Sequence, residues 1–93
     1  MNNITSVTKE QIKEIKFAQE EVLKNISEIS KRRADLEKAA TLGNGYKTKS
    51  KIVFETEEGL KQIETHVWAA MEKNVALKGG INIPIRCIHD VMF

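Results

Sequence analysis

The chain has 93 residues, of which 41% are hydrophobic and 30% are charged, and its formal net charge is +2 at pH 7. This length suits one small domain, and the composition favours a folded chain over a disordered one. One cysteine excludes an internal disulfide, and such a mild charge does not by itself indicate a nucleic-acid-binding protein. Because a core of this size buries little surface, self-association is the expected additional source of stability.

The first residues show no targeting pattern. The opening MNNITSVTKEQ has no basic stretch followed by an apolar run, which a secretory signal requires. No apolar run approaches the roughly 20 residues that a membrane helix needs. We therefore expect a cytoplasmic protein without membrane contact, in which residues 1–7 form a flexible N-terminus.

Residues 8–42 are predicted to form one long amphipathic helix at the start of the chain. Thr8 and Gln11 match a capping box, and neither glycine nor proline interrupts the stretch before Gly43. Gly43 is expected to end the helix in the left-handed conformation, and residues 43–50 are predicted to be a turn or linker. Such a helix would be about 50 Å long, which is more than a small sheet can cover.

The apolar residues of this predicted helix recur every seven positions, which is typical of a coiled coil. The residues expected to carry oligomerisation are Ile15, Val22, Ile26, Ile29 and Leu36. Gln19 and Arg33 interrupt the seam, although polar residues at such positions can fix register. The alternative is an amphipathic helix that lies across its own sheet. The length of the helix favours a homo-oligomer, with a dimer as the expected form.

Residues 51–93 are predicted to form a small antiparallel β domain, because their apolar residues mostly alternate. Strands are expected over residues 49–56, 60–71, 75–78, 81–83 and 89–93. Gly59 is expected in a hairpin turn, and Gly79-Gly80 in a tight turn with positive φ. The predicted fold class is therefore α+β, with a long N-terminal helix followed by a five-stranded antiparallel meander or small barrel.

A corner between the last two strands contains the only proline and the only cysteine. Pro84 cannot donate to a sheet, so it is expected to end a strand before one helical turn that includes Cys87. The arrangement G-x-x-I-P-x-x-x-I-x-x-V in Gly80–Val91 resembles the final corner of Src-homology-3-like and Sm-like small barrels. Residues 51–93 are also similar to short uncharacterised bacterial proteins with a helix followed by a small sheet. These resemblances imply a fold and no particular function.

The sequence predicts neither an enzyme nor a metal or cofactor site. Cys87 has no C-x-x-C partner, so it is expected to be a small buried side chain and not a reactive thiol. His66, Cys87 and His89 lack the paired short spacings of zinc ligands. Neither a nucleophile elbow nor a phosphate-binding loop is present. Trp68 is expected in the core beneath the helix, and a partner-facing position is the alternative.

Two functions remain as alternatives. The favoured one is a non-catalytic cytoplasmic protein-interaction or assembly module that self-associates through its helix and has an unidentified protein partner. The other is a nucleic-acid-binding Sm-like barrel that uses the basic helix–sheet junction. The basic residues of this junction are Lys31, Arg32, Arg33, Lys47 and Lys49. Nucleic-acid binding also needs exposed aromatic side chains beside these charges, since bases stack on them, and Tyr46 is the only aromatic residue between them.

Overall fold

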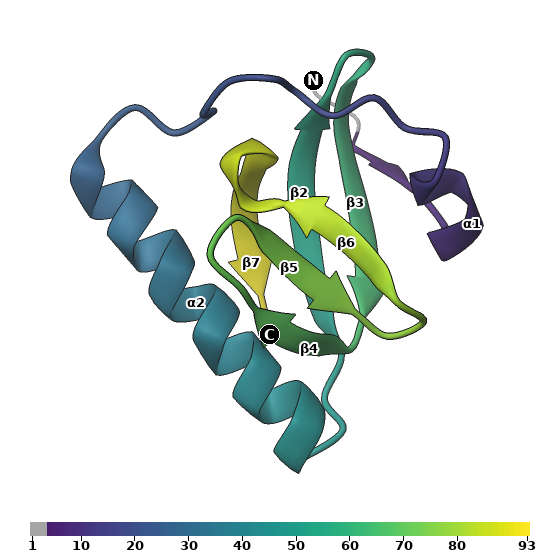
Figure 1. The fold of residues 1–93 in the computed structure, drawn as a ribbon, viewed down its shortest axis with the longest axis vertical. Coiled ribbons are helices and arrows are strands. Elements are labelled where there is room, and N and C mark those ends of the chain that lie inside the picture. Colours follow the sequence, from purple (N-terminus) through teal and green to yellow (C-terminus); the bar gives the residue numbers. More distant parts are fainter. Residues whose placement is uncertain (1–3) are drawn as a thin grey trace.

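A computed structural model describes residues 4–93 and confirms an α+β fold, in which one long helix packs on two small sheets (Figure 1). The elements are β1 (Thr5–Ser6), α1 (Lys9–Ile12), α2 (Ile26–Gly45), β2 (Ser50–Thr56), β3 (Gly59–Thr65), β4 (Val67–Ala70), β5 (Asn74–Leu77), β6 (Ile81–Pro84), the 3₁₀ turn η1 (Ile85–Cys87) and β7 (Ile88–Met92). One sheet has the strand order β1-β3-β2-β7 and the other β4-β5-β6. All pairs of neighbouring strands are antiparallel except β1 and β3.

The long helix lies in the middle of the chain, so the predicted N-terminal helix over residues 8–42 is wrong. The predicted capping box exists: Gln11 N–H donates to Thr8 Oγ1 (3.3 Å), and Thr8 N–H donates to Gln11 Oε1 (2.8 Å). It starts only the short helix α1. The long helix α2 starts after Asn25, whose side-chain oxygen accepts a hydrogen bond from the backbone N–H of Glu28 (2.8 Å).

Residues 13–25, which we call the strap, connect α1 to α2 without forming a helix (Figure 1). Ala18 N–H donates to the carbonyl of Glu55 at the end of β2 (3.1 Å). The ring of Phe17 lies 5.8 Å from the ring of Phe54, which is fully buried in the core. The apolar residues of the strap therefore pack on the strands of the same chain and not on the helix of a second copy. This tertiary packing outweighs the helical pattern, because helix propensity is a weak preference.

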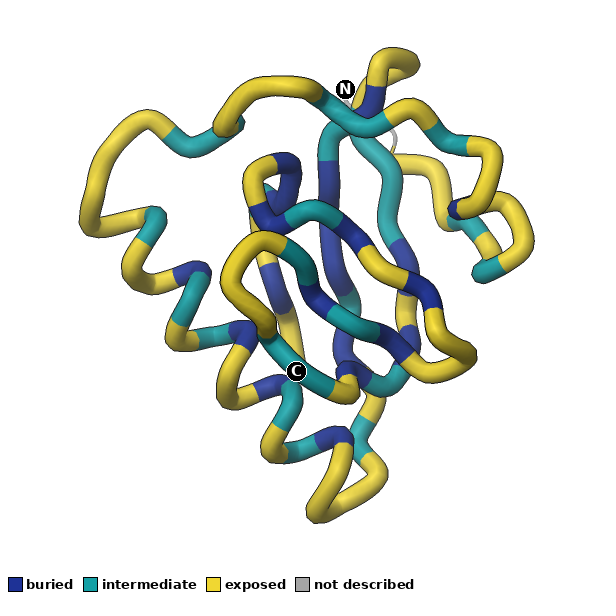
Figure 2. Tube along the Cα trace, in the orientation of Figure 1, coloured by how far each residue is buried: buried dark blue, intermediate teal, exposed yellow. Residues whose placement is uncertain are grey.

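The helix α2 packs against β4 and β7 through a narrow face of small and apolar residues, and Figure 2 shows its buried residues on the side that faces the strands. Leu36 and Ala39 are fully buried in the same core as the strands. A Cβ atom on Gly43 would lie 2.5 Å from the backbone oxygen of Val67 in β4. Gly43 is therefore a contact residue inside α2, and the prediction that it ends the helix is wrong, since α2 continues to Gly45.

The β region largely follows the prediction. The stretch predicted as one strand over residues 60–71 is divided at His66 into β3 and β4, which belong to different sheets. Gly79 and Gly80 have positive φ, and Pro84 ends β6 before η1, as predicted. The strand β1 was not predicted. It pairs with β3 and lies within the predicted flexible N-terminus, of which residues 1–3 are outside the described residues.

The strands do not close into a barrel, so this part of the fold prediction is wrong. No ladder of hydrogen bonds joins the two sheets within residues 4–93. The chain leaves one sheet at His66 and returns to it through η1, which is a helical turn and cannot pair as a strand. The sheets and α2 share one core. Its fully buried strand residues include Ile52, Phe54, Val67, Val75, Leu77, Ile83 and Ile88.

Candidate functional site

The residues predicted to form an oligomerisation seam do not share one helix face. Ile15 and Val22 lie in the strap, and Leu36 is fully buried against the strands. Ile29 is half-buried, and Ile26 is 81% exposed at the first position of α2. The continuous coiled-coil seam is therefore absent, because it requires one helix from residue 15 to residue 36. Self-association itself stays a prediction.

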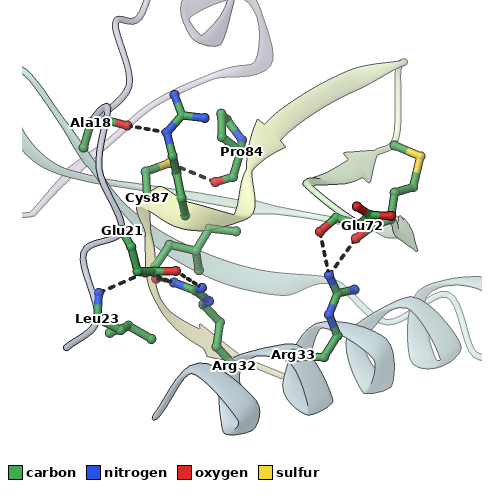
Figure 3. Close-up of polar contacts among 11 residues, drawn as sticks. Ala18, Glu21, Leu23, Arg32, Arg33, Glu72, Pro84 and Cys87 are labelled. Carbon is green, nitrogen blue, oxygen red and sulfur yellow. Dashed lines mark hydrogen bonds and ion pairs between the residues drawn. The ribbon is translucent and has the colours of Figure 1, made fainter. Parts of the chain in front are cut away.

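Two of the five basic residues predicted at the helix–sheet junction are neutralised by carboxylates of the chain. Lys31 Nζ lies 2.6 Å from Asp35 Oδ2 on the surface of α2. Arg32 is buried, and its two Nη atoms donate to the carboxylate oxygens of Glu21 at 2.7 and 2.5 Å (Figure 3). Arg32 also donates to the carbonyl of Ile88 (3.0 Å). It therefore ties the strap and β7 to α2 and is not available to bind nucleic acid.

The ion pair with Arg32 also changes the acidity of the Glu21 carboxyl group. The hydrogen bond from Arg32 lowers the pKa of Glu21 below the usual value of a glutamate, and partial burial opposes this shift. A carboxylate that accepts two charged N–H groups is stabilised in its ionised form. The pair therefore persists at neutral pH and fixes the strap to the first half of α2.

Cys87 is buried in η1, as predicted from the sequence. Its thiol donates to the carbonyl of Pro84 (3.1 Å), and burial raises the pKa of the thiol to about 12 (Figure 3). The thiolate is the reactive form of cysteine. Cys87 is therefore a packing residue and not a nucleophile at neutral pH.

The two histidines make separate contacts. His66 Nε2 lies 3.0 Å from the carbonyl of Lys47, and His89 Nε2 lies 2.7 Å from Glu55 Oε1. Within residues 4–93, no three histidine, cysteine or acidic side chains are placed to hold a metal ion. None of the helices in the described part of the chain is both long and apolar enough to span a bilayer.

Of the other three predicted basic residues, Arg33 donates to the carbonyls of Met71 and Glu72, and Lys47 and Lys49 are exposed after the end of α2. Lys47 lines a shallow depression of about 210 Å³, which we call the Trp68 depression. Its lining residues are Gly43, Asn44, Lys47, His66, Trp68 and Lys78. Two lysines and one tryptophan thus line the same depression, and no acidic side chain of the described residues does so. A concave site with this charge attracts anions.

Trp68 is 46% exposed, so its predicted position in the core is wrong. The pairing of β4 with β5 shifts register between Val67 and Ala69, which leaves Trp68 at a β-bulge. Such bulges redirect side chains. The backbone at this point is held by Asn44 near the end of α2, whose Nδ2 donates to the carbonyl of Trp68 (2.7 Å). Val67, and not Trp68, is the residue that α2 covers.

The other residues of the depression are linked through their backbones. Lys47 has φ 57, which is uncommon for a residue other than glycine. Its carbonyl contacts the ring of His66, and the carbonyl of His66 accepts a hydrogen bond from Lys78 N–H (3.0 Å). Tyr46, immediately before Lys47, is 73% exposed. The depression is therefore organised by the fold, and a second exposed aromatic residue lies next to it in the chain.

Sequence reasoning gave Trp68 a partner-facing position only as the alternative to the core and did not assign Lys78 to a site. One signal was present for Trp68, because strand alternation places it opposite Val67 and Ala69, which form the more apolar face. That face is the one expected to meet the core. For Lys78 no local signal exists, since it reaches the depression through the β4–β5 hairpin.

No known family model matches the chain, and neither a curated protein nor a solved structure is similar to it. The resemblance of Gly80–Val91 to the corner of Src-homology-3-like and Sm-like barrels therefore stays a prediction. Function must be inferred from the residues of the site.

Proposed function

We propose that the chain is a non-catalytic binding module that takes single-stranded nucleic acid in the Trp68 depression. The observation that carries this proposal is the half-exposed Trp68 beside Lys47 and Lys78 in one concave site. Aromatic side chains stack on bases of any sequence and contribute about 1–3 kcal/mol per base, while lysines neutralise the phosphates. The depression combines both elements.

A single strand is favoured over a duplex because only an unpaired base can present its face to the indole ring. Few phosphates are contacted, since Lys47 and Lys78 line the depression and Lys49 is exposed two residues after Lys47. Binding should therefore be weak and should depend on salt. Two to three neutralised phosphates predict a slope of about −1.4 to −2.1 for log K against log salt concentration on a single strand.

Of the two functions that the sequence left open, nucleic-acid binding has the better support. The assembly module depends on a continuous helical seam, which requires Ile15 and Val22 to lie in the same helix as Leu36. Nucleic-acid binding lacked an aromatic partner for the basic residues, and Trp68 supplies one. The non-catalytic class is retained in both.

Tryptophan fluorescence tests the proposal directly, because Trp68 is the only tryptophan in the chain. We expect a ten-nucleotide oligothymidylate to quench this fluorescence at about 50 mM salt, where electrostatic binding is strong. With a labelled oligonucleotide, Trp68→Ala should weaken binding about tenfold, which matches the loss of one stacked base, and Trp68→Phe should retain most of it. Absence of quenching at this salt concentration would contradict the proposal.

A matched pair of charge variants separates this site from general charge attraction. Lys78→Gln should make the salt slope less negative by about 0.7, the effect of one phosphate on a single strand. Lys31→Gln changes the net charge equally, but Lys31 is paired with Asp35 and lies outside the depression, so the slope should not change. Equal losses in both variants would mean that binding is not located at the depression.

A third variant separates binding from stability. Lys47→Gly removes a charge from the depression and also removes the steric cost of a side chain at the positive φ of this residue. We expect it to be more stable than the wild type by up to about 1 kcal/mol, since glycine adopts this conformation without steric cost. Weaker oligonucleotide binding by a protein of undiminished stability would exclude unfolding as the cause.

A further inference from the structure

A second basic site lies in a cleft of about 360 Å³ between α2, the β4–β5 turn and η1. The charged residues that line this cleft are Arg32, Arg33, Lys73 and Arg86, with Glu21 and Glu72 of opposite sign. None of them lines the Trp68 depression. Four positive groups against two negative ones give the cleft a surplus of positive charge.

Two of these arginines are held in place without being neutralised. Arg33 Nη2 donates to the carbonyls of Met71 (2.8 Å) and Glu72 (3.0 Å), as Figure 3 shows. Arg86 Nε donates to the carbonyl of Ala18 (3.0 Å), and its two Nη atoms have no acceptor within residues 4–93. Carbonyl groups orient a guanidinium but do not cancel its charge. Both guanidinium groups therefore keep their full charge at fixed positions.

Arg32 adds a buried contribution to the cleft. Its side chain is 4% exposed and its charge is balanced by Glu21, but its Nε is buried and has no acceptor among the described residues. A buried donor without a partner is costly, and native proteins keep few of them. Arg32 therefore forms part of the wall of the cleft, and the cationic groups that an anion can reach are those of Arg33, Lys73 and Arg86.

We infer that this cleft binds a phosphate group. Guanidinium groups match the tetrahedral oxygens of phosphate with pairs of parallel hydrogen bonds, and Lys73 adds a third positive charge. A phosphate monoester, which carries nearly two negative charges at neutral pH, gains more from three cationic groups than a carboxylate or a phosphodiester, which carry one charge. The phosphate could belong to a small phosphate ester or to the backbone of a nucleic acid, and the inference does not depend on stacking at Trp68.

The test is a titration of the uniformly ¹⁵N-labelled protein with inorganic phosphate at constant ionic strength, followed by amide chemical shifts. Saturable changes are expected at residues 33, 71–73 and 85–87, which surround the cleft. Arg86→Gln should weaken the affinity about tenfold, the effect of removing a charged hydrogen-bond donor. Shift changes that do not saturate, or that are the same in Arg86→Gln, would overturn the inference.

Two further variants serve as controls for this titration. Lys73 is exposed, so Lys73→Gln should keep the fold and also weaken phosphate binding, even where Arg86→Gln disturbs η1. Lys31→Gln makes the same change of charge outside the cleft and should bind phosphate as the wild type does. Equal weakening by Lys31→Gln would indicate general charge attraction and would contradict a specific site.

The source of the phosphate is distinguished by a parallel titration with the oligothymidylate. Weaker oligonucleotide binding in Arg86→Gln would assign the cleft to the nucleic-acid backbone. Phosphate binding without any oligonucleotide binding would assign it to a small phosphate ester, and it would contradict the proposed function while leaving the cleft intact. Binding of neither probe would overturn both.

Discussion

Gly43→Ala is expected to destabilise the protein, because α2 and β4 touch at this residue. The added Cβ would lie 2.5 Å from the carbonyl oxygen and 3.2 Å from the nitrogen of Val67, whereas real contacts of this kind essentially never fall below 3.0 Å. Both of these atoms belong to the backbone of β4, so no side-chain rotation can relieve the contact. The helix or the strand must move, and the surrounding core must move with it.

The magnitude follows from two opposing effects. Overpacking of a close-packed contact costs about 1–3 kcal/mol, while alanine is about 1 kcal/mol more favourable than glycine inside a helix. We expect a net loss of about 1–2 kcal/mol in the free energy of unfolding, since a backbone contact places the cost in the upper part of its range. In a domain of this size, each kcal/mol lowers the Tm by roughly 4–8 °C.

Gly45→Ala is the matched control in the same helix, because its Cβ would meet nothing within 4 Å. It should leave stability unchanged or raise it by up to about 1 kcal/mol. Urea unfolding followed by far-UV circular dichroism measures both variants, and equal m values would show that the unfolded states are comparable. A Gly43→Ala protein as stable as the wild type would refute the close contact of α2 with β4. Destabilisation of Gly45→Ala would contradict a helix that continues to residue 45.

Three other predictions concern the strap, the buried thiol and assembly. Cys87 should react with a thiol reagent at neutral pH only when the protein unfolds, because burial raises its pKa to about 12; rapid reaction of the folded protein would contradict this. The pKa of Glu21 is lowered in the folded state, so its ion pair with Arg32 adds stability that is complete above the ordinary pKa of 4.5 and is lost as the pH falls through the lowered pKa. Glu21→Gln should remove this part of the pH dependence of the unfolding free energy, measured with urea. A variant whose unfolding free energy changes between about pH 3 and pH 6 as much as that of the wild type would refute the prediction. The predicted homodimer is tested by light scattering at micromolar concentration, where a mass near 10.5 kDa would contradict it.

The strands and turns after residue 50 were largely predictable because their signals are local. Gly79 and Gly80 adopt positive φ, and Pro84 ends β6, for steric reasons that act within a few residues. The alternation that puts Ile52 and Phe54 on one face also held, and both are fully buried. Whether the strands close into a barrel or form two sheets was not predictable in this way, since it depends on pairing between segments far apart in the chain.

The first half of the chain shows the limit of periodic patterns. A seven-residue repeat of apolar residues fits a coiled coil, but Ile15 of this repeat instead packs against the core together with Phe17 and Ala18 of the strap. A local signal for the true start of the helix was present, because Asn25 is a good N-cap and Glu28 follows it three residues later. The repeat extends across this signal, and only the tertiary contacts of the strap with β2, α2 and η1 distinguish it from a helix.

The sequence by itself determined the α+β class, the turn positions after residue 50, the burial of Cys87 and the absence of a disulfide. It also determined which residues share a strand face, because alternation follows from the geometry of an extended backbone. It did not determine which face of β4 the helix covers. That choice places Val67 inside and Trp68 outside, and it depends on the close contact at Gly43, which is 24 residues from Val67. Lys47, Trp68 and Lys78 therefore line one depression only in the tertiary structure, because the segments that carry them are held together by hydrogen bonds between residues far apart in the chain, such as Asn44 with Trp68 and His66 with Lys47.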